Sequence, residues 1–116
     1  MVKTPESAIL SGCLNYLKVR RIYCWRNNTG AVRIATGRFI SFGKKGSSDI
    51  LGCLPNGRFL AVEVKAQGGR LSPEQKQFIV DISELGGMAL VVKSRQELDE
   101  ALRTAGFTDD GPLFGG

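Results

Sequence analysis

The stretch that decides the fold is SDILGCLPNGRFLAVEVK, residues 48–65. It contains two apolar runs, at residues 50–54 and 59–65, and the turn sequence LPNG at residues 54–57. Apolar and β-branched runs of this length on either side of proline, asparagine and glycine predict two antiparallel strands joined by a hairpin. The second run is apolar on both alternating faces at its start, which is typical of a central strand covered on both sides.

The turn fixes which side chains face each other across this hairpin. Proline, asparagine and glycine at the second, third and fourth positions suit a type I turn whose last residue has a positive φ angle. We therefore expect a three-residue loop over residues 55–57, which puts Asp49 opposite Glu63. Opposed residues of an antiparallel pair share a face, with Cβ atoms about 4.5–5.5 Å apart, so the two carboxylates would converge. A two-residue loop would put Asp49 opposite Val64, on the other face.

The end of the second strand carries the residue types of a metal site. Glu63 and Lys65 lie on one face of this strand, because side chains alternate from residue to residue. Together with Asp49, they would bring two carboxylates and an ammonium group to one edge of the sheet. Two carboxylates with room for water suit Mg²⁺, and the backbone carbonyl of Val64 is a candidate further ligand. The alternative is an ordinary ion pair between Glu63 and Lys65 at an exposed strand end.

Two predicted helices each carry a polar residue on an otherwise apolar stripe. A helix over residues 5–20 begins at a capping threonine and a proline, and Glu6 lies one turn before the first residue of its stripe. A helix over residues 72–85 begins with the capping-box sequence SPEQ, and Gln75 lies on its stripe. A carboxylate on a core-facing stripe is costly unless it is paired or bound to a cation. Both residues have a structural alternative, because the helix dipole favours an acid at Glu6 and the capping box accounts for Gln75.

The region between the first helix and the hairpin predicts two further strands. Residues 22–27 and 31–36 are rich in β-branched and aromatic residues and lie on either side of turn-forming residues 27–30. Residues 37–46 are basic and contain glycine, so we expect a mobile connector at the surface there.

The C-terminal part completes an α/β pattern. An apolar run at residues 88–92 predicts a buried strand, and a second capping box, starting at residue 94, opens a short helix. The predicted order is α-β-β-β-β-α-β-α, which describes a mixed central sheet flanked by helices. We expect one domain over residues 1–105 and a loose tail over residues 106–116.

Composition bounds the chemistry and the partners. The chain has 116 residues and no histidine, which excludes Ser-His-Asp triads, Cys-His proteases, histidine metal sites and nucleases with a histidine general base. Its three cysteines are widely spaced and form no CxxC pair, so we expect buried free thiols. No apolar run has the length of a membrane span, and the first residues lack the order of a secretory signal, so we expect a cytoplasmic protein with no membrane partner.

Basic residues are concentrated in the N-terminal part of the chain. Residues 1–48 hold nine Lys or Arg and one acid, a net charge of +8, whereas the remainder holds seven Lys or Arg and ten acids, a net charge of −3. This asymmetry predicts a polyanionic partner, because Lys and Arg that neutralise phosphates release counterions. A basic surface kept for solubility is the alternative. The candidate DNA-binding residues are Arg20, Arg21, Arg26, Arg33, Arg38, Lys44 and Lys45.

Three short motifs together resemble a known family. In chain order they are GSSDI at residues 46–50, EVK at residues 63–65 and LSPEQK at residues 71–76. Their ordered combination resembles the VRR-Nuc branch of the PD-(D/E)xK nuclease superfamily, which has the restriction-endonuclease-like fold, and the resemblance covers roughly residues 4–93. Ser48 departs from the pattern, because this branch commonly has proline before the aspartate.

The resemblance implies a role for each candidate residue. Asp49 and Glu63 would be metal ligands, with the backbone carbonyl of the residue after Glu63 assisting. Lys65 would orient or deprotonate the attacking water and stabilise charge on the phosphate. Gln75 would position the nucleophile or Lys65, and Glu6 would hold a water or a second metal ion.

The resemblance also implies a function, that of a Mg²⁺- or Mn²⁺-dependent DNA endonuclease hydrolysing phosphodiester bonds through a metal-activated water. Stand-alone members of this size resemble phage and bacterial enzymes that act as homodimers on branched DNA, including four-way (Holliday) junctions. Two alternatives stay open. One is a non-catalytic basic DNA-binding module on the same fold, and the other is an RNA-binding protein that uses Tyr16, Tyr23 and Trp25 as stacking surfaces.

Overall fold

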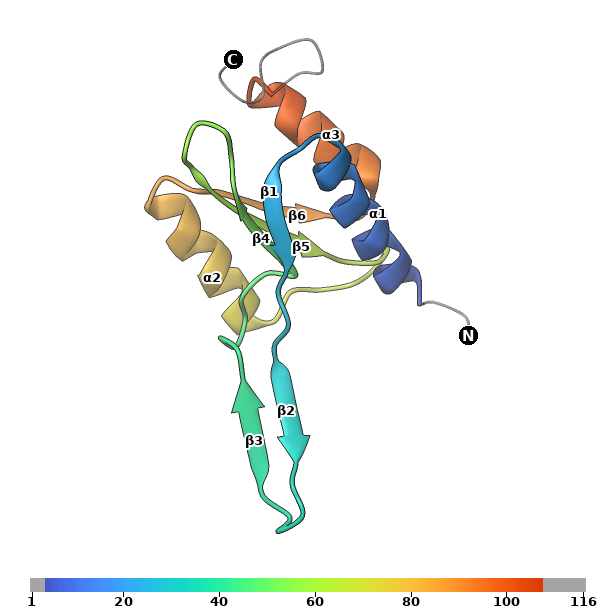
Figure 1. Ribbon diagram of the computed structural model, residues 1–116, viewed down its shortest axis with the longest axis vertical. Helices are drawn as coiled ribbons and strands as arrows, with labels where there is room; N and C mark the ends of the chain where they lie inside the picture. The colour runs from blue at the N-terminus through green and yellow to red at the C-terminus, as the bar shows by residue number, and fades with distance from the viewer. Residues whose placement is uncertain (1–3, 108–116) are drawn as a thin grey trace.

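The computed structural model describes residues 4–107, which form one mixed sheet, three helices and a separate hairpin (Figure 1). The elements in chain order are α1 (Pro5–Val19), β1 (Tyr23–Arg26), β2 (Gly30–Arg33), β3 (Phe39–Phe42), β4 (Ile50–Cys53), β5 (Phe59–Val64), α2 (Pro73–Glu84), β6 (Met88–Val92) and α3 (Arg95–Thr104). The main sheet has the strand order β1-β4-β5-β6, in which only the β5–β6 pair is parallel. The predicted fold class, a mixed central sheet flanked by helices, is confirmed.

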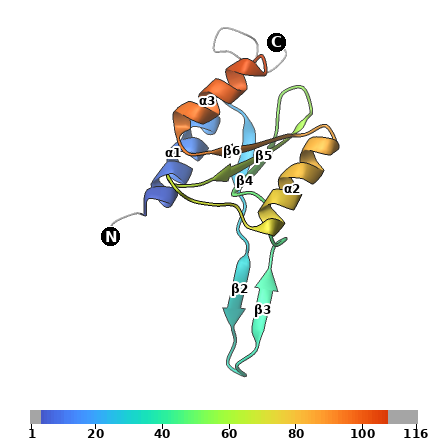
Figure 2. The same ribbon diagram turned by 180° about the vertical axis from the view of Figure 1, so that it is seen from behind.

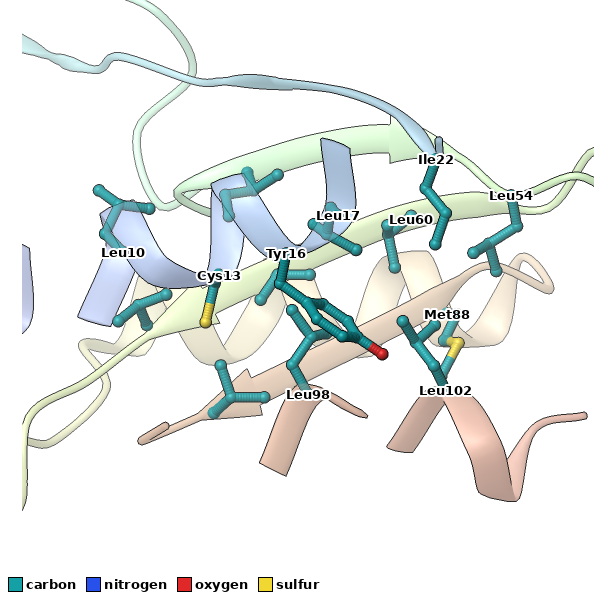
Figure 3. Close-up of a cluster of buried hydrophobic side chains, with 14 residues drawn as sticks. Leu10, Cys13, Tyr16, Leu17, Ile22, Leu54, Leu60, Met88, Leu98 and Leu102 are labelled. Carbon is teal, nitrogen blue, oxygen red and sulfur yellow. The ribbon is translucent and has the colours of Figure 1, made fainter. Parts of the chain in front are cut away.

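The helices cover the sheet from both sides. Helices α1 and α3 pack against each other and against one face, whereas α2 packs against β5 and β6 on the opposite face (Figures 1 and 2). The apolar stripe of α1 meets the sheet and α3 in the main core, which Figure 3 shows in close-up. Strand β5 is therefore buried on both faces, and polar side chains at its end are held in a defined place.

The β4–β5 hairpin has the predicted register. Ile50 pairs with Val62, and the turn is closed by the amide of Gly57, which donates to the carbonyl of Leu54 at 2.8 Å. Gly57 has a φ of 89°, the left-handed conformation that the turn type requires. Extending the register by one residue from Ile50 puts position 49 opposite position 63, as expected from the three-residue loop.

The predicted connector over residues 37–46 contains a strand, and this prediction was wrong. Residues 39–42 form β3, which pairs with β2 in a separate two-stranded antiparallel sheet. Val32, for example, lies opposite Ile40. We call this hairpin, residues 30–42, the arm, because it extends away from the body (Figures 1 and 2). The segment FISF has the composition of a strand, but the neighbouring glycines and basic residues favoured a loop at the level of sequence.

Strands β1 and β2 are neighbours in sequence but belong to different sheets. Strand β1 forms the edge of the main sheet beside β4, with Trp25 opposite Leu51. The turn-forming residues 27–30 therefore lead from the main sheet into the arm instead of closing a hairpin between the two strands.

The cysteines and the C-terminal end differ in part from expectation. Cys13 is buried in the core, but Cys53 is exposed, because it ends β4 on the face that α1 does not cover. Within the predicted tail, the amide of Phe107 donates to the carbonyl of Leu102 at 2.8 Å, so the tail is held at its start. Residues 108–116 lie outside the described residues. Over the described part of the chain, no helix has the length and apolar character of a membrane span.

Candidate active site

Four of the predicted site residues come together where β4 begins and β5 ends. Asp49 precedes β4, and its Oδ2 accepts a hydrogen bond of 2.8 Å from the backbone amide of Val64. The Nζ of Lys65 lies 3.8 Å from Oε2 of Glu63. The same Glu63 oxygen accepts a hydrogen bond of 3.2 Å from Nε2 of Gln75 on α2. Two carboxylates, an ammonium group and an amide thus share one site.

Glu63 is the electrostatic centre of this site. Its side chain is only 2% exposed, because β5 lies between two strands and beneath α2. Burial, followed by the charge of the neighbouring Asp49 carboxylate, raises the pKa of Glu63 above its usual range, and Lys65 acts in the opposite direction. Its Oε1 atom has no hydrogen-bond partner among residues 4–107. A buried carboxylate in this state is costly unless a cation neutralises it, so the residues present fit a divalent metal.

Glu6 lies beside the site but is not assembled into it. Glu6 and Asp49 line an open hollow of about 410 Å³ together with Thr4, Ser7, Leu10 and Arg26. Its charge contributes to the raised pKa of Glu63, so it is close enough to act electrostatically. However, within residues 4–107 no three His, Cys, Asp or Glu side chains are placed to hold one metal ion. The predicted role of Glu6, which is to hold a water or a second metal ion, stays a prediction.

Gln75 completes the capping box of α2 and also contacts Glu63. Its backbone amide donates to Oγ of Ser72 at 3.1 Å, and its Oε1 accepts from the amide of Ser72 at 2.9 Å, which completes a capping box. The remaining Nε2 donates to Glu63. The cap therefore fixes the side chain that contacts the buried carboxylate, and the observed contact runs to Glu63 instead of to Lys65.

Sequence reasoning missed Asn27, which anchors the segment before Asp49. Its backbone amide donates to the carbonyl of Asp49 at 2.7 Å. Its side-chain Nδ2 donates to the carbonyl of Ser48 at 2.9 Å and to Oγ of Ser47 at 2.7 Å. These three bonds hold the backbone at the position where the family pattern has proline. No local pattern reveals this contact, because Asn27 and its partners are about twenty residues apart.

Arg20 was predicted to contact DNA, and the structure corrects this prediction. Its side chain is 9% exposed and donates to the hydroxyl of Tyr16 at 2.5 Å and to the carbonyl of Phe107 at 3.0 Å, and it lies 3.5 Å from Asp99. The guanidinium therefore ties α1 to α3. Arg20 is the C-cap residue of α1. The distribution of charge along the sequence does not reveal that this end of the helix packs on α3, so the charge pattern alone suggested an exposed residue.

The other candidate DNA-binding residues are exposed. They lie in the turn before β1, at the end of β1, on the arm and in the link from the arm to β4. Arg26 borders the hollow that contains Asp49. Arg33 stacks over the ring of Phe39 at 4.4 Å, and Lys45 lies 3.6 Å from Glu74. The remaining members of the set are Arg21, Arg38 and Lys44.

The three aromatic residues of the RNA-binding alternative do not form one surface. Tyr16 is a core residue whose hydroxyl donates to Asp99. Tyr23 and Trp25 are exposed on β1 and contact each other edge to face, with ring centroids 5.9 Å apart.

Comparison with known proteins defines the class of this chain. The VRR-NUC domain profile matches residues 16–96, so the chain belongs to the VRR-NUC domain family, a family of nucleases. This range contains Asp49, Glu63, Lys65 and Gln75 and leaves Glu6 outside. The chain is also 37% identical over 65 residues to the protein named "Putative nuclease p44" from Acyrthosiphon pisum secondary endosymbiont phage 1, a match that covers 56% of this chain and 69% of that protein. No solved structure matches the chain at a significant level.

Proposed function

We propose that the protein is a Mg²⁺- or Mn²⁺-dependent DNA endonuclease that acts as a homodimer on branched DNA such as four-way junctions. The observation that carries the metal dependence is the buried Glu63 carboxylate, which has an unpartnered oxygen and lies beside a second carboxylate. In a nuclease-family chain without histidine, this pair supplies the oxygen ligands that a hard divalent cation prefers.

Asp49 and Glu63 would hold the cation, with the backbone carbonyl of Val64 as a third oxygen. When bound, a divalent ion of this kind lowers the pKa of a water ligand and neutralises charge on the phosphate. The Val64 amide keeps the Asp49 carboxylate in place by donating to it. Gln75 acts as a positioning residue, because its hydrogen bond fixes the orientation of the Glu63 carboxylate.

In the proposed reaction, Lys65 is the catalytic cation. Its ammonium group lies beside Glu63 at the end of a buried strand and keeps limited contact with solvent. From this position it can orient the attacking water and stabilise the negative charge that develops on the phosphate. Electrostatic stabilisation of this kind is strong in a partly buried site, because water screens it less.

Binding of DNA would use the exposed basic residues around the site and on the arm. These contacts go to phosphates, so affinity should depend on DNA shape and salt more than on sequence. Symmetric resolution of a four-way junction needs two cuts related by a two-fold axis. A two-fold dimer supplies two sites with this symmetry, whereas one chain supplies one.

Incubation of the purified protein with plasmid, linear duplex and four-way-junction DNA tests this proposal, with Mg²⁺, with Mn²⁺ and with EDTA. We expect cleavage only with a divalent cation, and preferentially of the junction. Tight junction binding without cleavage under all metal conditions would support the non-catalytic DNA-binding module instead. Preferential binding of RNA over DNA would support the RNA-binding alternative.

A further inference from the structure

The arm is the feature of this molecule that the nuclease site does not explain. It contains a two-stranded sheet that extends away from the body (Figures 1 and 2). A two-stranded hairpin is only marginally stable in water, yet this one exposes the apolar side chains of Val32, Phe39, Ile40 and Phe42. Exposed apolar groups gathered on one projecting element indicate a binding surface.

One face of the arm combines apolar side chains with an arginine. Val32 pairs with Ile40. Two positions along, the backbone amide of Ile34 donates to the carbonyl of Arg38 at 2.9 Å, which continues the β2–β3 register. Opposed residues share a face, and every second pair lies on the same face. Arg38 therefore lies on the face that carries Val32 and Ile40.

The other face carries the most exposed aromatic ring of the arm. Phe39 pairs with Arg33, and its side chain is 62% exposed. The Arg33 guanidinium lies 4.4 Å from the centre of this ring, and its Nη1 donates to the carbonyl of Gly37 in the turn at 3.3 Å. The guanidinium thus covers one side of the ring and holds it near the turn. The exposed side of the ring is free to stack on another flat group.

The charge of this region favours a nucleic acid as the partner of the arm. Residues 7–48 contain no Asp or Glu, and each face of the arm carries an arginine. Nucleic acid offers phosphates to the arginines and the flat faces of bases to the aromatic ring. In a regular duplex the base faces are covered by their neighbours. The ring can therefore reach a base only where the stack of base pairs is interrupted.

We infer that the arm recognises the branch point of DNA, where Phe39 stacks on a base at the interruption and Arg38 contacts a flanking phosphate. This inference rests on the proposed function for its substrate, and it makes Phe39 a specificity-determining residue. Inserting an apolar ring between bases costs unstacking energy, and this cost is smallest where the bases are already unstacked. The ring therefore favours branched over unbranched DNA, which phosphate contacts alone do not distinguish.

The base of the arm is tied to the candidate active site. The backbone amide of Asn27, before β2, donates to the carbonyl of Asp49, after β3, at 2.7 Å. Asp49 lies ten residues after Phe39, so the two positions are at most about 36 Å apart. This distance is about one turn of B-DNA. A base held by Phe39 thus fixes which phosphate, within about one turn of the branch point, reaches Asp49.

Fluorescence anisotropy in EDTA tests the role of the ring without cleavage. It compares the affinity of the full chain for a four-way junction and for a linear duplex of the same sequence. Phe39→Leu removes the ring and keeps apolar bulk, so we expect junction binding to weaken about tenfold. Duplex binding should stay within about twofold, because no charge changes. Phe39→Trp, which keeps an aromatic ring, should retain the preference for the junction.

Phe42→Leu is the matched control, because it makes the same substitution at an arm ring that lies over Gly30. It should bind both DNAs as the wild type does. A junction preference that persists in Phe39→Leu, or that is lost equally in Phe42→Leu, would overturn the inference.

Photo-crosslinking of the wild-type chain does not depend on the folding of a variant. 5-Iodouracil, a base that couples to a stacked aromatic ring on irradiation, replaces thymine at the branch point or, as the control, in the middle of one duplex of the junction. Mass spectrometry should locate the adduct on Phe39, and only with the base at the branch point. Equal yields from the two positions, or an adduct on another residue alone, would overturn the inference.

The outcomes separate this inference from the proposed nuclease function. Binding of the junction through Phe39 without cleavage under any metal condition would support the inference and contradict the nuclease. Cleavage with a junction preference that ignores Phe39 would do the reverse. Two further results would overturn the inference by assigning the ring to another partner. They are tighter Phe39-dependent binding of RNA than of the junction, and a lower mass of Phe39→Leu than of the wild type in light scattering without DNA.

Discussion

At the scale of single residues, the protein keeps a carboxylate where folding alone would not favour it. Glu63 is buried, carries an unpartnered oxygen, and faces Asp49, whose charge further disfavours ionisation. Lys65 and Gln75 offset only part of this cost. Active sites often retain groups that destabilise the fold. A substitution that removes the Glu63 charge should therefore raise stability and lower activity.

Glu63→Gln should therefore stabilise the metal-free protein and inactivate it. The amide has the shape of the carboxylate without its charge, so we expect the free energy of unfolding to rise by about 1 kcal/mol. Cleavage should be lost, because an amide is a poor ligand for a hard cation. Urea unfolding in EDTA and plasmid nicking in Mn²⁺ check the two halves. A variant that is less stable and still cleaves would show that Glu63 has a purely structural role.

Lys65→Ala separates catalysis from binding. Loss of the ammonium group should reduce cleavage by about 10²-fold or more. Junction affinity should change by only a few fold, because one charge is a small part of a phosphate-neutralising surface. Single-turnover cleavage and gel-shift titration measure these quantities, and Lys76→Ala, an exposed lysine on α2, is the control. A parallel loss of binding and cleavage would assign Lys65 to DNA binding alone.

At the scale of helices and strands, short sequence motifs predicted the turns and helix caps but not the contacts between residues far apart in the chain. The LPNG turn fixed the β4–β5 register because its geometry depends on four consecutive residues. The caps of α1 and α2 were likewise visible in short motifs. The arm was missed because β3 depends on pairing with β2 and lies among loop-forming residues. The contacts of Arg20 with α3 and of Asn27 with the Asp49 segment join residues too far apart in sequence for any local motif.

The start of α2 offers a test that separates its cap from the site. Gln75→Glu keeps a capping-box acceptor but removes the amide that donates to Glu63 and adds a third carboxylate. We expect strongly reduced cleavage. Because the new carboxylate lies beside the buried Glu63, we also expect stability to fall as the two acids ionise with rising pH. Ser72→Ala removes the cap and leaves the donor, so it should cost about 1 kcal/mol of stability with most activity retained. Thermal melts and nicking rates on both variants check this, and the reverse pattern would make Gln75 a capping residue only.

At the scale of the whole molecule, two basic chains would present their charges to one branched DNA. Junction affinity should fall at least about tenfold between 50 and 200 mM salt and should depend little on sequence. Arg38→Ala, on the arm, should lower the slope of log affinity against log salt by about 1, whereas Arg38→Lys should keep it. Fluorescence anisotropy over a salt series measures both slopes. An unchanged slope in Arg38→Ala would remove the arm from the DNA-binding surface.

Diffraction from a crystal soaked in Mn²⁺ shows whether Asp49 and Glu63 form a metal site. We expect one anomalous peak with an oxygen of each carboxylate at about 2.0–2.3 Å, close to the distances of Mg²⁺ sites. The peak should be absent from a Glu63→Gln crystal soaked in the same way. A wild-type crystal with no peak between these two side chains, or with its only strong peak elsewhere, would show that they do not form a metal site.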